Sequence, residues 1–193
     1  IVKRSGLIPV AQMIKNNEKV GAIVAPAIEG QLPGSIEQIK EAIKKAGFTE
    51  VVEVAEGAKI TAEKEAKELE ERKAKGVGFL ATSCCPAWFT LVDKHIPQLK
   101  DHISSTLSPM GYTAQLCKER YPGYKVVFIG PCVAKRYEAA TRYPDTIDRV
   151  ISYSELAAIF AAKDIDVQSM SVDFDDEECS SFEDCRDFPQ SGG

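Results

Sequence analysis

Three cysteines of this chain stand where chemistry is expected. Cys84 and Cys85 are adjacent in a Thr-Ser-Cys-Cys-Pro-Ala-Trp stretch, and Cys132 lies in a Gly-Pro-Cys-Val-Ala-Lys stretch. Each stretch follows a short apolar run, at 77–81 and at 126–129, that is typical of a buried strand. In open α/β sheets the ligand crevice lies just beyond the carboxyl ends of the strands, so thiols placed there are candidate metal ligands or nucleophiles.

The adjacency of two cysteines limits the possible chemistry. Successive side chains of an extended backbone point to opposite sides, so we expect Cys84 and Cys85 to do different jobs, or one of them to be structural. A disulfide between them would be strained, since neighbouring Cα atoms are only about 3.8 Å apart. A zinc site is poorly supported, because the chain has no C-x-x-C pair and His95 and His102 lie at no useful spacing. Thiolate ligands for iron–sulfur chemistry fit better, and burial as a small apolar side chain is the alternative for any single cysteine.

The composition bounds the class of protein. The chain has 193 residues, 44% hydrophobic and 27% charged, which is enough for one sizeable globular domain. Its net charge of -5 argues against nucleic acid as a partner, because phosphate binding needs basic patches. The sequence contains no long apolar stretch and no signal-peptide pattern, so we expect no membrane span and a cytoplasmic location. Six cysteines in such a chain indicate metal or redox chemistry more than a disulfide framework.

Apolar runs alternate with helical patterns along the chain. Strands are expected at 20–25, 51–55, 77–81 and 124–129, with 149–152 as a candidate edge strand. Helices are expected between Ser35 and Gly47, and at 61–75, 86–95, 109–120, a short segment through 138, and 154–162. Ser35 with Gln38 forms a capping-box pattern, and Ser154 is the expected N-cap of the last helix. Strands separated by helices predict an α/β fold with a mostly parallel four-stranded sheet flanked by helices.

Three stretches resemble signatures of the iron-only ([FeFe]) hydrogenases. The stretch at 82–88 is similar to the first signature of that family, and the stretch from Pro131 to Glu138 resembles the second, which runs P-C-x-x-K-x-x-E. Ala25-Pro26-Ala27 is similar to the A-P-S or A-P-A segment near the family's active site. The resemblance covers essentially the whole chain, 1–193. It implies the N-terminal lobe of the two-lobed catalytic domain, in a parent protein that catalyses reversible proton reduction and hydrogen oxidation.

The same resemblance implies a role for each matching position. Cys85 and Cys132 would be two of the four cysteines that hold the H-cluster, a [4Fe–4S] cubane joined to a diiron unit. Cys84 would carry protons to and from the diiron unit, and Lys135 would donate a hydrogen bond to an iron-bound cyanide. The pocket around the diiron unit would be lined by Ala25, Pro26, Ala27 and Pro131.

A proton path is also implied, because the family uses Glu, Ser, Glu and Arg side chains for this purpose. Glu65, Glu68 and Arg72 stand at i, i+3 and i+7 on one helix face, and Ser104 precedes the helix that starts near residue 109. A proton relay needs such groups within hydrogen-bond reach, directly or through one water. The alternative for this face is a solvated set of charges in a helix rich in Lys and Glu.

The chain departs from the family at several positions. The family's third signature, which supplies the other two cluster cysteines, has no counterpart here. Cys179 and Cys185 lie in an acidic segment, 171–190, that we interpret as a surface loop without a cluster role, and Cys117 is expected in the core. Gly130 stands where catalytic members usually have Met, which predicts a gap beside the diiron unit.

These departures shape the functional expectation. The chain is expected to be a piece of a longer protein, with the second lobe of the same domain and a ferredoxin or other iron–sulfur electron carrier as partners. By itself it is expected to be inactive and not to hold an intact H-cluster. The alternative function is that of a non-catalytic iron–sulfur protein of the same family, with a role in iron–sulfur assembly or in hydrogen sensing.

Overall fold

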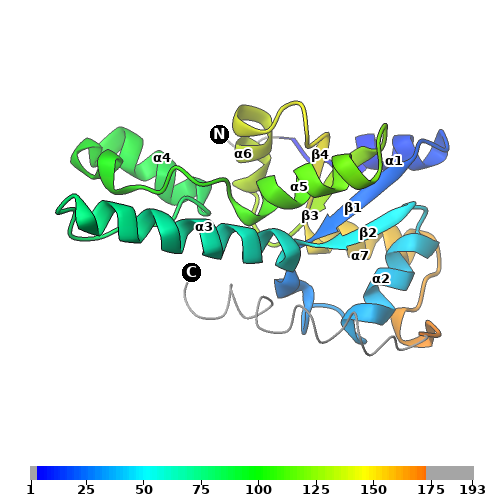
Figure 1. Ribbon diagram of the computed structural model, residues 1–193. Helices are drawn as coiled ribbons and strands as arrows, with labels where there is room; N and C mark the ends of the chain where they lie inside the picture. The colour runs from blue at the N-terminus through cyan, green and yellow to red at the C-terminus, as the bar shows by residue number, and fades with distance from the viewer. Residues whose placement is uncertain (1–3, 173–193) are drawn as a thin grey trace.

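A four-stranded, all-parallel sheet forms the centre of the molecule. The computed structural model describes residues 4–172. The strands follow the order β2-β1-β3-β4, and each neighbouring pair is parallel. Their bounds are β1 (Val20–Val24), β2 (Glu50–Glu53), β3 (Lys125–Ile129) and β4 (Arg149–Ile151). The predicted α/β class and the mostly parallel four-stranded sheet are therefore confirmed, with β4 as the expected edge strand (Figure 1).

Seven α-helices and three short 3-10 helices are assigned within residues 4–172. The α-helices are α1 (Leu7–Lys15), α2 (Ile36–Lys45), α3 (Val54–Ala74), α4 (Pro86–His95), α5 (Pro109–Arg120), α6 (Lys135–Arg142) and α7 (Tyr153–Ala162). The 3-10 helices are η1 (Pro26–Ile28), η2 (Pro97–His102) and η3 (Val167–Ser169). Core residues of α1, α2 and α7 pack on one face of the sheet, and those of α3, α5 and α6 pack on the other.

Both faces of the sheet are buried, which explains the unbroken apolar runs of its central strands. In β1, Ala22 and Val24 face the first helix layer while Ile23 faces the second. In β3, Val127 faces the first helix layer and Phe128 faces the second. A parallel strand that is covered on both faces reads as continuous apolar sequence rather than as alternation. The central position of β1 and β3 therefore follows from their composition.

Local capping signals predicted several helix ends correctly. Ser35 and Gln38 form the expected capping box at the start of α2, and α4 and α5 have the expected bounds. The prediction of Ser154 as the N-cap of α7 is wrong. Ser152 takes that position, because its hydroxyl accepts the Glu155 backbone N–H and the Glu155 side chain accepts the Ser152 N–H. The strand β4 ends at Ile151, one residue before Ser152, and Ser152 has the extended conformation that an N-cap needs.

Two predicted boundaries around the long helix α3 are also wrong. The helix begins at Val54 rather than near residue 61, so the apolar run at 51–55 is divided between β2 and α3. The run at 77–81 is not a strand of the sheet, and only Ala81 forms an isolated bridge, with Ile103. Its Phe79 is half exposed and stacks on the His102 ring. Figure 1 shows that α3 extends beyond the sheet. Near its far end, Arg72 donates to the carbonyls of Asp101 and Ile103 rather than contacting a strand of the sheet.

No helix among residues 4–172 is both long enough and apolar enough to cross a lipid bilayer. The predicted acidic loop at 171–190, with Cys179 and Cys185, lies almost wholly outside the described residues, which end at 172. Cys117 is fully buried in the second helix layer, as expected. A methyl group added at Gly21 would lie 2.9 Å from its sulfur, so this thiol fills space against β1.

Candidate functional site

The site begins at the carboxyl ends of the two central strands. Val24 of β1 pairs with Ile129 of β3, so the loops that follow both strands start side by side. The Ala25 backbone N–H donates to the Ile129 carbonyl at 2.9 Å, and the Tyr153 hydroxyl donates to the Ala25 carbonyl at 3.0 Å. These bonds fix the Ala-Pro-Ala segment at the edge where α/β proteins place their ligands.

A cavity of about 200 Å³ opens at this edge. It is lined by Ala25, Pro26, Ala27, Val54, Ala58, Cys84, Pro109, Met110, Phe128, Pro131, Cys132 and Lys135. Seven of these were named from the sequence: the Ala-Pro-Ala segment, Cys84, Pro131, Cys132 and Lys135. They come from three loops and one helix start that are far apart along the chain. The structure therefore brings most of the predicted cofactor contacts to one place.

The remaining lining residues form an apolar wall that the sequence did not single out. Val54 and Ala58 lie on α3, Met110 lies on α5, and Phe128 lies on β3. The two helices approach closely at Gly57, where an added methyl group would lie 2.3 Å from the Pro109 carbonyl oxygen. Nothing distinguishes these side chains from ordinary core residues in the sequence, since apolar type and helical spacing are all that they show.

The two adjacent cysteines have different surroundings, as expected. Cys84 is half-buried and lines the cavity. Cys85 is exposed and is the N-cap of α4, where its sulfur accepts the Trp88 backbone N–H at 3.4 Å. An N–H donor at a helix N-terminus stabilises negative charge on such a sulfur. Cys132 is exposed at the cavity rim, so Cys85 and Cys132 are accessible thiols beside the same site.

Lys135 is held in the cavity wall by two acceptors. Its ammonium nitrogen donates to the Cys84 carbonyl oxygen and to Glu138 Oε2, each at 2.7 Å. The Glu138 side chain is fully buried, and its Oε1 has no hydrogen-bond partner among the described atoms. Lys135 and Glu138 are three residues apart on α6, so their side chains lie on the same face of the helix. The ion pair therefore fixes the Lys135 ammonium beside Cys84 and Cys132, the two cysteines of the cavity.

The space next to the Gly130 Cα is occupied by a neighbouring aromatic ring. A methyl group built at Gly130 would lie 2.4 Å from the edge of the Phe128 ring, and Phe128 is only 2% exposed. The aromatic ring of the preceding strand therefore fills the space that a larger residue at position 130 would need. A side chain at position 130 would therefore clash with Phe128, while the gap expected beside a bound diiron unit stays a prediction.

The predicted proton-path residues form a hydrogen-bonded network. Glu68 accepts the Ser104 hydroxyl at 2.7 Å and forms an ion pair with Arg72 at 2.6 Å. The Ser105 backbone N–H lies 3.1 Å from the same carboxylate. Glu65, one turn earlier on α3, is buried and accepts the Ser83 backbone N–H at 3.3 Å, next to Cys84. The alternative of a solvated charged face is therefore wrong for Glu65 and Glu68, whose partners lie in the loops that precede α4 and α5.

The two carboxyl groups of this network have opposite electrostatic environments. Burial raises the pKa of Glu65 above its usual value, although the Ser83 N–H and the Ser104 hydroxyl oppose this effect. Burial acts in the same direction on Glu68, but hydrogen bonds from Ser104, Ser105 and Arg72 outweigh it and lower the pKa of Glu68 to about 2. The inner carboxyl, Glu65, therefore takes up a proton more readily than a solvent-exposed Glu, and the outer one, Glu68, less readily.

Family membership follows from comparison with known proteins. Residues 18–193 match the family described as the iron only hydrogenase large subunit, C-terminal domain. The chain belongs to this family. Curated relatives include iron hydrogenase 1 of Clostridium pasteurianum, 31% identical over 134 residues that cover 62% of this chain and 23% of the relative. The NADP-reducing hydrogenase subunit HndD of Solidesulfovibrio fructosivorans is 28% identical over 207 residues, which cover 91% of this chain and 35% of the relative.

Other relatives extend the comparison. The cytosolic Fe–S cluster assembly factor NAR1 of Meyerozyma guilliermondii is 30% identical over 133 residues, covering 61% of this chain and 25% of the relative. Among solved structures, an [FeFe]-hydrogenase studied for oxygen inactivation superposes with a TM-score of 0.76 at 26% identity. The apo [FeFe]-hydrogenase HydA1 of Chlamydomonas reinhardtii superposes with a TM-score of 0.75 at 26% identity. Each superposition covers 87% of this chain and half of the solved chain, and the chain spans about a quarter to a third of the length of the curated relatives.

The donor set of the described residues fits part of an H-cluster site. Cys85 and Cys132 are free, exposed thiols, and the cavity beside them presents Cys84 and the fixed cation of Lys135. Soft thiolates are the ligands that iron–sulfur clusters take, and a buried cation complements an anionic ligand. Residues 4–172 contain no group of three or more His, Cys, Asp or Glu side chains that could hold a metal. Among residues 4–172, Cys85 and Cys132 are the two free thiols at the positions where the family motifs place cluster ligands.

Proposed function

We propose that this chain is the N-terminal lobe of an iron hydrogenase catalytic domain, in a protein that interconverts protons and hydrogen at an H-cluster. The observation that carries the proposal is the single cavity at the carboxyl edge of β1 and β3, which gathers Cys84, Cys132, Lys135 and the Ala-Pro-Ala segment. These are the residue types that the family motifs require, and they are separated by up to 110 positions in the sequence.

Each side chain has a distinct task in this proposal. Cys85 and Cys132 would ligate the cluster as thiolates, and the H-cluster, when bound, supplies the redox chemistry at iron. Lys135 would donate to an anionic ligand of the cluster, in place of or beside its bond to the Cys84 carbonyl. Glu138 would keep the ammonium directed into the cavity, because the carboxylate is buried and cannot move to solvent.

The network on α3 would move protons between Cys84 and the surface. Glu65 is suited to hold a proton, because burial raises its pKa, and it accepts from the backbone beside Cys84. The Ser104 hydroxyl interacts with both carboxyl groups, so it can pass a proton between Glu65 and Glu68. Arg72 also donates to the Asp101 carbonyl, which connects the network to the exposed end of α3.

Protonation of Glu68 is the unfavourable step of this proton path. Its pKa of about 2 means that a proton placed on this carboxylate is released quickly, so Glu68 would act as a transient carrier or as the acceptor that orients Ser104. A proton entering from the surface would need the Arg72 ion pair to weaken first. We therefore expect transfer through Glu68 to be slower than transfer between Glu65 and Cys84.

The rest of the proposed assembly lies outside this chain. Phe89, Val133 and Tyr137 are exposed apolar side chains next to the cysteine-bearing loops, a surface that suits the second lobe of the domain. That lobe would supply the two missing cysteines, and a ferredoxin or other iron–sulfur carrier would supply electrons. We expect the isolated chain not to hold an intact H-cluster. A cytoplasmic location stays a prediction, since one similar protein is a periplasmic [Fe] hydrogenase large subunit and others are cytosolic assembly factors.

A second function is favoured by one specific comparison. The similarity to NAR1 supports a non-catalytic iron–sulfur role, in assembly or in sensing, as the alternative. Cys84 and Lys135 discriminate between the two, because a protein that only binds a cubane needs neither a proton-carrying thiol nor a buried cation at the diiron position. Both residues line the cavity here, which supports the hydrogenase function.

Cluster binding by the full natural protein that contains this chain tests the proposed ligand roles. Cys85→Ser and Cys132→Ser should each abolish the electron paramagnetic resonance signal of the reduced cubane and lower bound iron. Cys84→Ala should keep the cubane and the infrared band of the iron-bound cyanide, and lose only the proton-coupled shift of that band. Cys117→Ala is the matched control, since that thiol is buried away from the cavity. Full iron content in Cys85→Ser and Cys132→Ser would contradict the proposal.

A further inference from the structure

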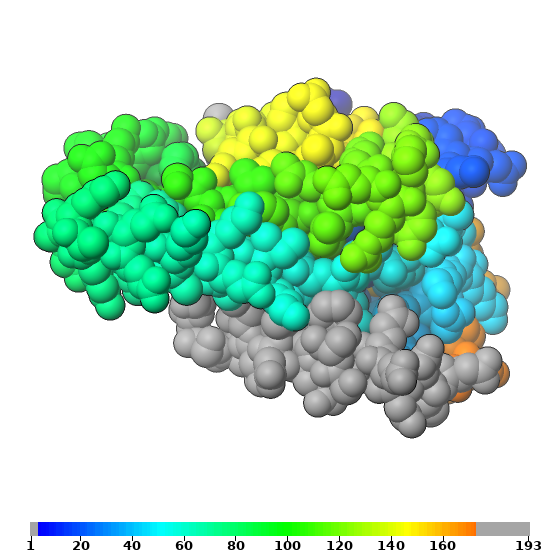
Figure 2. All heavy atoms as spheres, viewed as in Figure 1, coloured from blue at the N-terminus to red at the C-terminus, as the bar shows by residue number. Residues whose placement is uncertain are grey.

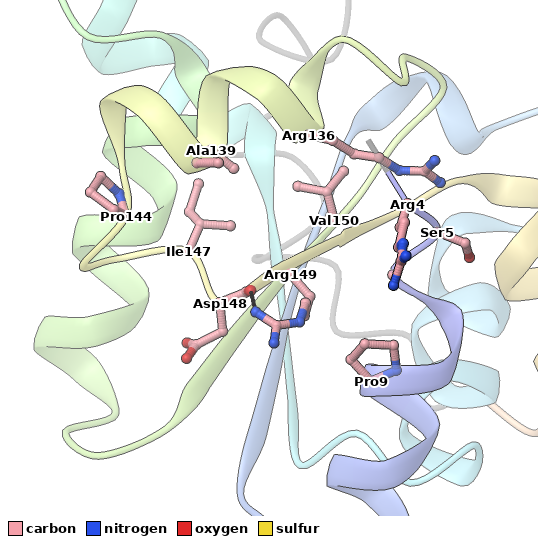
Figure 3. A pocket seen from close by; sticks show the side chains of 12 residues that line it. Arg4, Ser5, Pro9, Arg136, Ala139, Pro144, Ile147, Asp148, Arg149 and Val150 are labelled. Atoms are coloured by element: carbon pink, nitrogen blue, oxygen red, sulfur yellow. Dashed lines mark hydrogen bonds between the residues drawn. The ribbon is translucent and has the colours of Figure 1, made fainter. Parts of the chain in front are cut away.

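A second, larger cavity lies on the edge-strand side of the molecule. Its volume is about 480 Å³, and it shares no lining residue with the cavity described above. It is lined by Arg4, Ser5, Gly6, Pro9, Arg136, Ala139, Ala140, Pro144, Ile147, Asp148, Arg149 and Val150. Figure 3 shows that it opens between the segment before α1, the strand β4 and the helix α6. This volume is within the range of small-molecule sites, about 300–1,000 Å³.

Three arginines from separate parts of the chain meet at this cavity. Arg4 precedes α1, Arg136 lies on α6, and Arg149 lies on β4. In Figure 3, Arg4 and Arg149 lie in the lower part of the opening, whereas Arg136 extends toward Ser5. Arg136 forms an ion pair with Glu155 at 2.7 Å. Among residues 4–172, neither Arg4 nor Arg149 is ion-paired with a carboxylate, although the chain as a whole carries a net charge of -5. Unpaired cations gathered in this way on an acidic protein indicate an anionic ligand.

The acidic side chain of the lining does not neutralise these arginines. The Asp148 carboxylate lies 3.3 Å from the Lys118 ammonium and 3.1 Å from the Lys125 ammonium, and it accepts the Val126 backbone N–H at 2.9 Å. Figure 3 shows this carboxylate pointing away from Arg4. Within the described part of the chain, Arg149 donates to the backbone carbonyl of Asp148 and to no side chain. The positive charge of the opening is therefore available to a ligand.

One wall of the cavity is apolar. Ala139, Ile147 and Val150 line the opening but are at most 5% exposed, so only a small part of each faces it, and the exposed Pro144 continues the wall. Opposite them lies Pro9 on α1. A free inorganic anion would leave this wall in contact with water, whereas an anion that carries a ring would cover it and gain from burial of apolar surface.

We propose that this cavity binds a small organic phosphate of nucleotide size, with its phosphate held by Arg4 and Arg149 and its ring against the Ile147 and Val150 wall. A guanidinium presents a planar fork of donors that matches phosphate oxygens, and a phosphate monoester carries close to two negative charges, which suits two unpaired arginines. The inference does not depend on the hydrogenase proposal, because no residue of the cysteine cavity takes part.

Calorimetric titration with adenosine diphosphate is the test. The protein should bind it with one-to-one saturation, more tightly than it binds pyrophosphate, which lacks the ring, and adenosine, which lacks the phosphate. Arg4→Gln and Arg149→Gln should each weaken binding by about tenfold or more, the value of a charge-assisted hydrogen bond. Arg149→Lys should retain part of the affinity, because it keeps the charge but loses the fork. Arg120→Gln, an arginine outside the cavity that pairs with Glu56, should leave binding unchanged.

The outcomes separate the parts of the proposal. Equal affinity for adenosine and its diphosphate, wild-type affinity in both arginine variants, or no saturation by about 5 mM would overturn it. Pyrophosphate binding as tight as the diphosphate nucleotide would overturn the role of the apolar wall. Citrate binding tighter than all of these would overturn the phosphate class in favour of carboxylates. Far-UV circular dichroism of each variant checks that the exposed arginines can be replaced without loss of fold.

Discussion

The ammonium of Lys135 lies 2.7 Å from Oε2 of Glu138, in an ion pair whose acid side chain is 0% exposed and whose base is 14% exposed. The same ammonium donates to the Cys84 carbonyl at 2.7 Å, so the pair connects α6 to the loop that carries both adjacent cysteines. A buried carboxylate of this kind is tolerated because of its partner. The chemistry of the cavity and the stability of the fold are therefore linked at Lys135.

Loss of Lys135 should destabilise the protein in the absence of any cluster. Lys135→Ala leaves Glu138 buried without a counter-charge, and we expect the free energy of unfolding in urea to fall by about 3–5 kcal/mol. The double variant Lys135→Met with Glu138→Leu should recover most of this loss, because it removes both charges. Lys100→Ala, which breaks an exposed pair with Asp93, is the control and should change stability little. A double variant as unstable as the single one would contradict the ion-pair account.

Glu68 should make the protein sensitive to acid. Because its folded-state pKa is lowered from 4.5 to about 2, its contribution to stability is present above pH 4.5 and is lost as the pH falls toward 2. This contribution is expected to be about 2 kcal/mol, after allowing for screening by solvent. Chemical unfolding between pH 2 and pH 7 should therefore show a steeper acid loss in the wild type than in Glu68→Gln. Glu70→Gln, on the exposed side of α3, is the control.

Glu65 should have the opposite effect. Its folded-state pKa is raised above 4.5, so its protonated form stabilises the native state below pH 4.5, and this contribution is lost as the pH rises through the folded-state pKa. The stability of the wild type relative to Glu65→Gln should thus decrease from pH 4.5 upward. Carbon-13 NMR of the Glu65 carboxyl group measures the shift directly, with exposed Glu63 as the reference signal. A titration midpoint of Glu65 below that of Glu63 would show that burial is not the dominant effect on the pKa of Glu65.

Gly130 should tolerate no side chain while Phe128 is present. Gly130→Ala places a methyl group within 2.4 Å of the Phe128 ring, and we expect a loss of about 1–3 kcal/mol in stability from overpacking. Phe128→Leu combined with Gly130→Ala should lose less than the two single changes added together. Gly78→Ala, where no atom lies within 4 Å of the added methyl group, is the matched control in thermal unfolding. Equal effects of Gly130→Ala and Gly78→Ala would contradict the packing explanation.

Local signals in the sequence predicted the elements whose ends are set by neighbouring residues. The Ser35 and Gln38 capping box and the proline at the first turn of α4 were sufficient to place those helices. The run at 77–81 has the composition of a strand, but whether it joins the sheet depends on where the long helix α3 directs the chain. That direction is a property of tertiary packing, and no short stretch of sequence contains it.

The same division applies to the site. Cys84, Cys85, Cys132 and Lys135 could be named from the sequence because their motifs are specific. The burial of Glu138 and the ring of Phe128 beside Gly130 could not, because each depends on a contact that forms only after folding. The grouping of Arg4, Arg136 and Arg149 also needed the structure, since the three residues share no motif and come from distant segments.

Hydrogen evolution with a chemical reductant is the most direct test of the central claim. It is measured on the full natural protein that contains this chain, loaded with its cluster, for the wild type, Cys84→Ala and the buried-thiol control Cys117→Ala. The wild type and Cys117→Ala are predicted to evolve hydrogen, while Cys84→Ala loses about 100-fold or more of the rate with unchanged cubane content, because a proton-transfer group is removed. A fully loaded wild type that evolves no hydrogen, or a Cys84→Ala variant with the wild-type rate, would contradict the account.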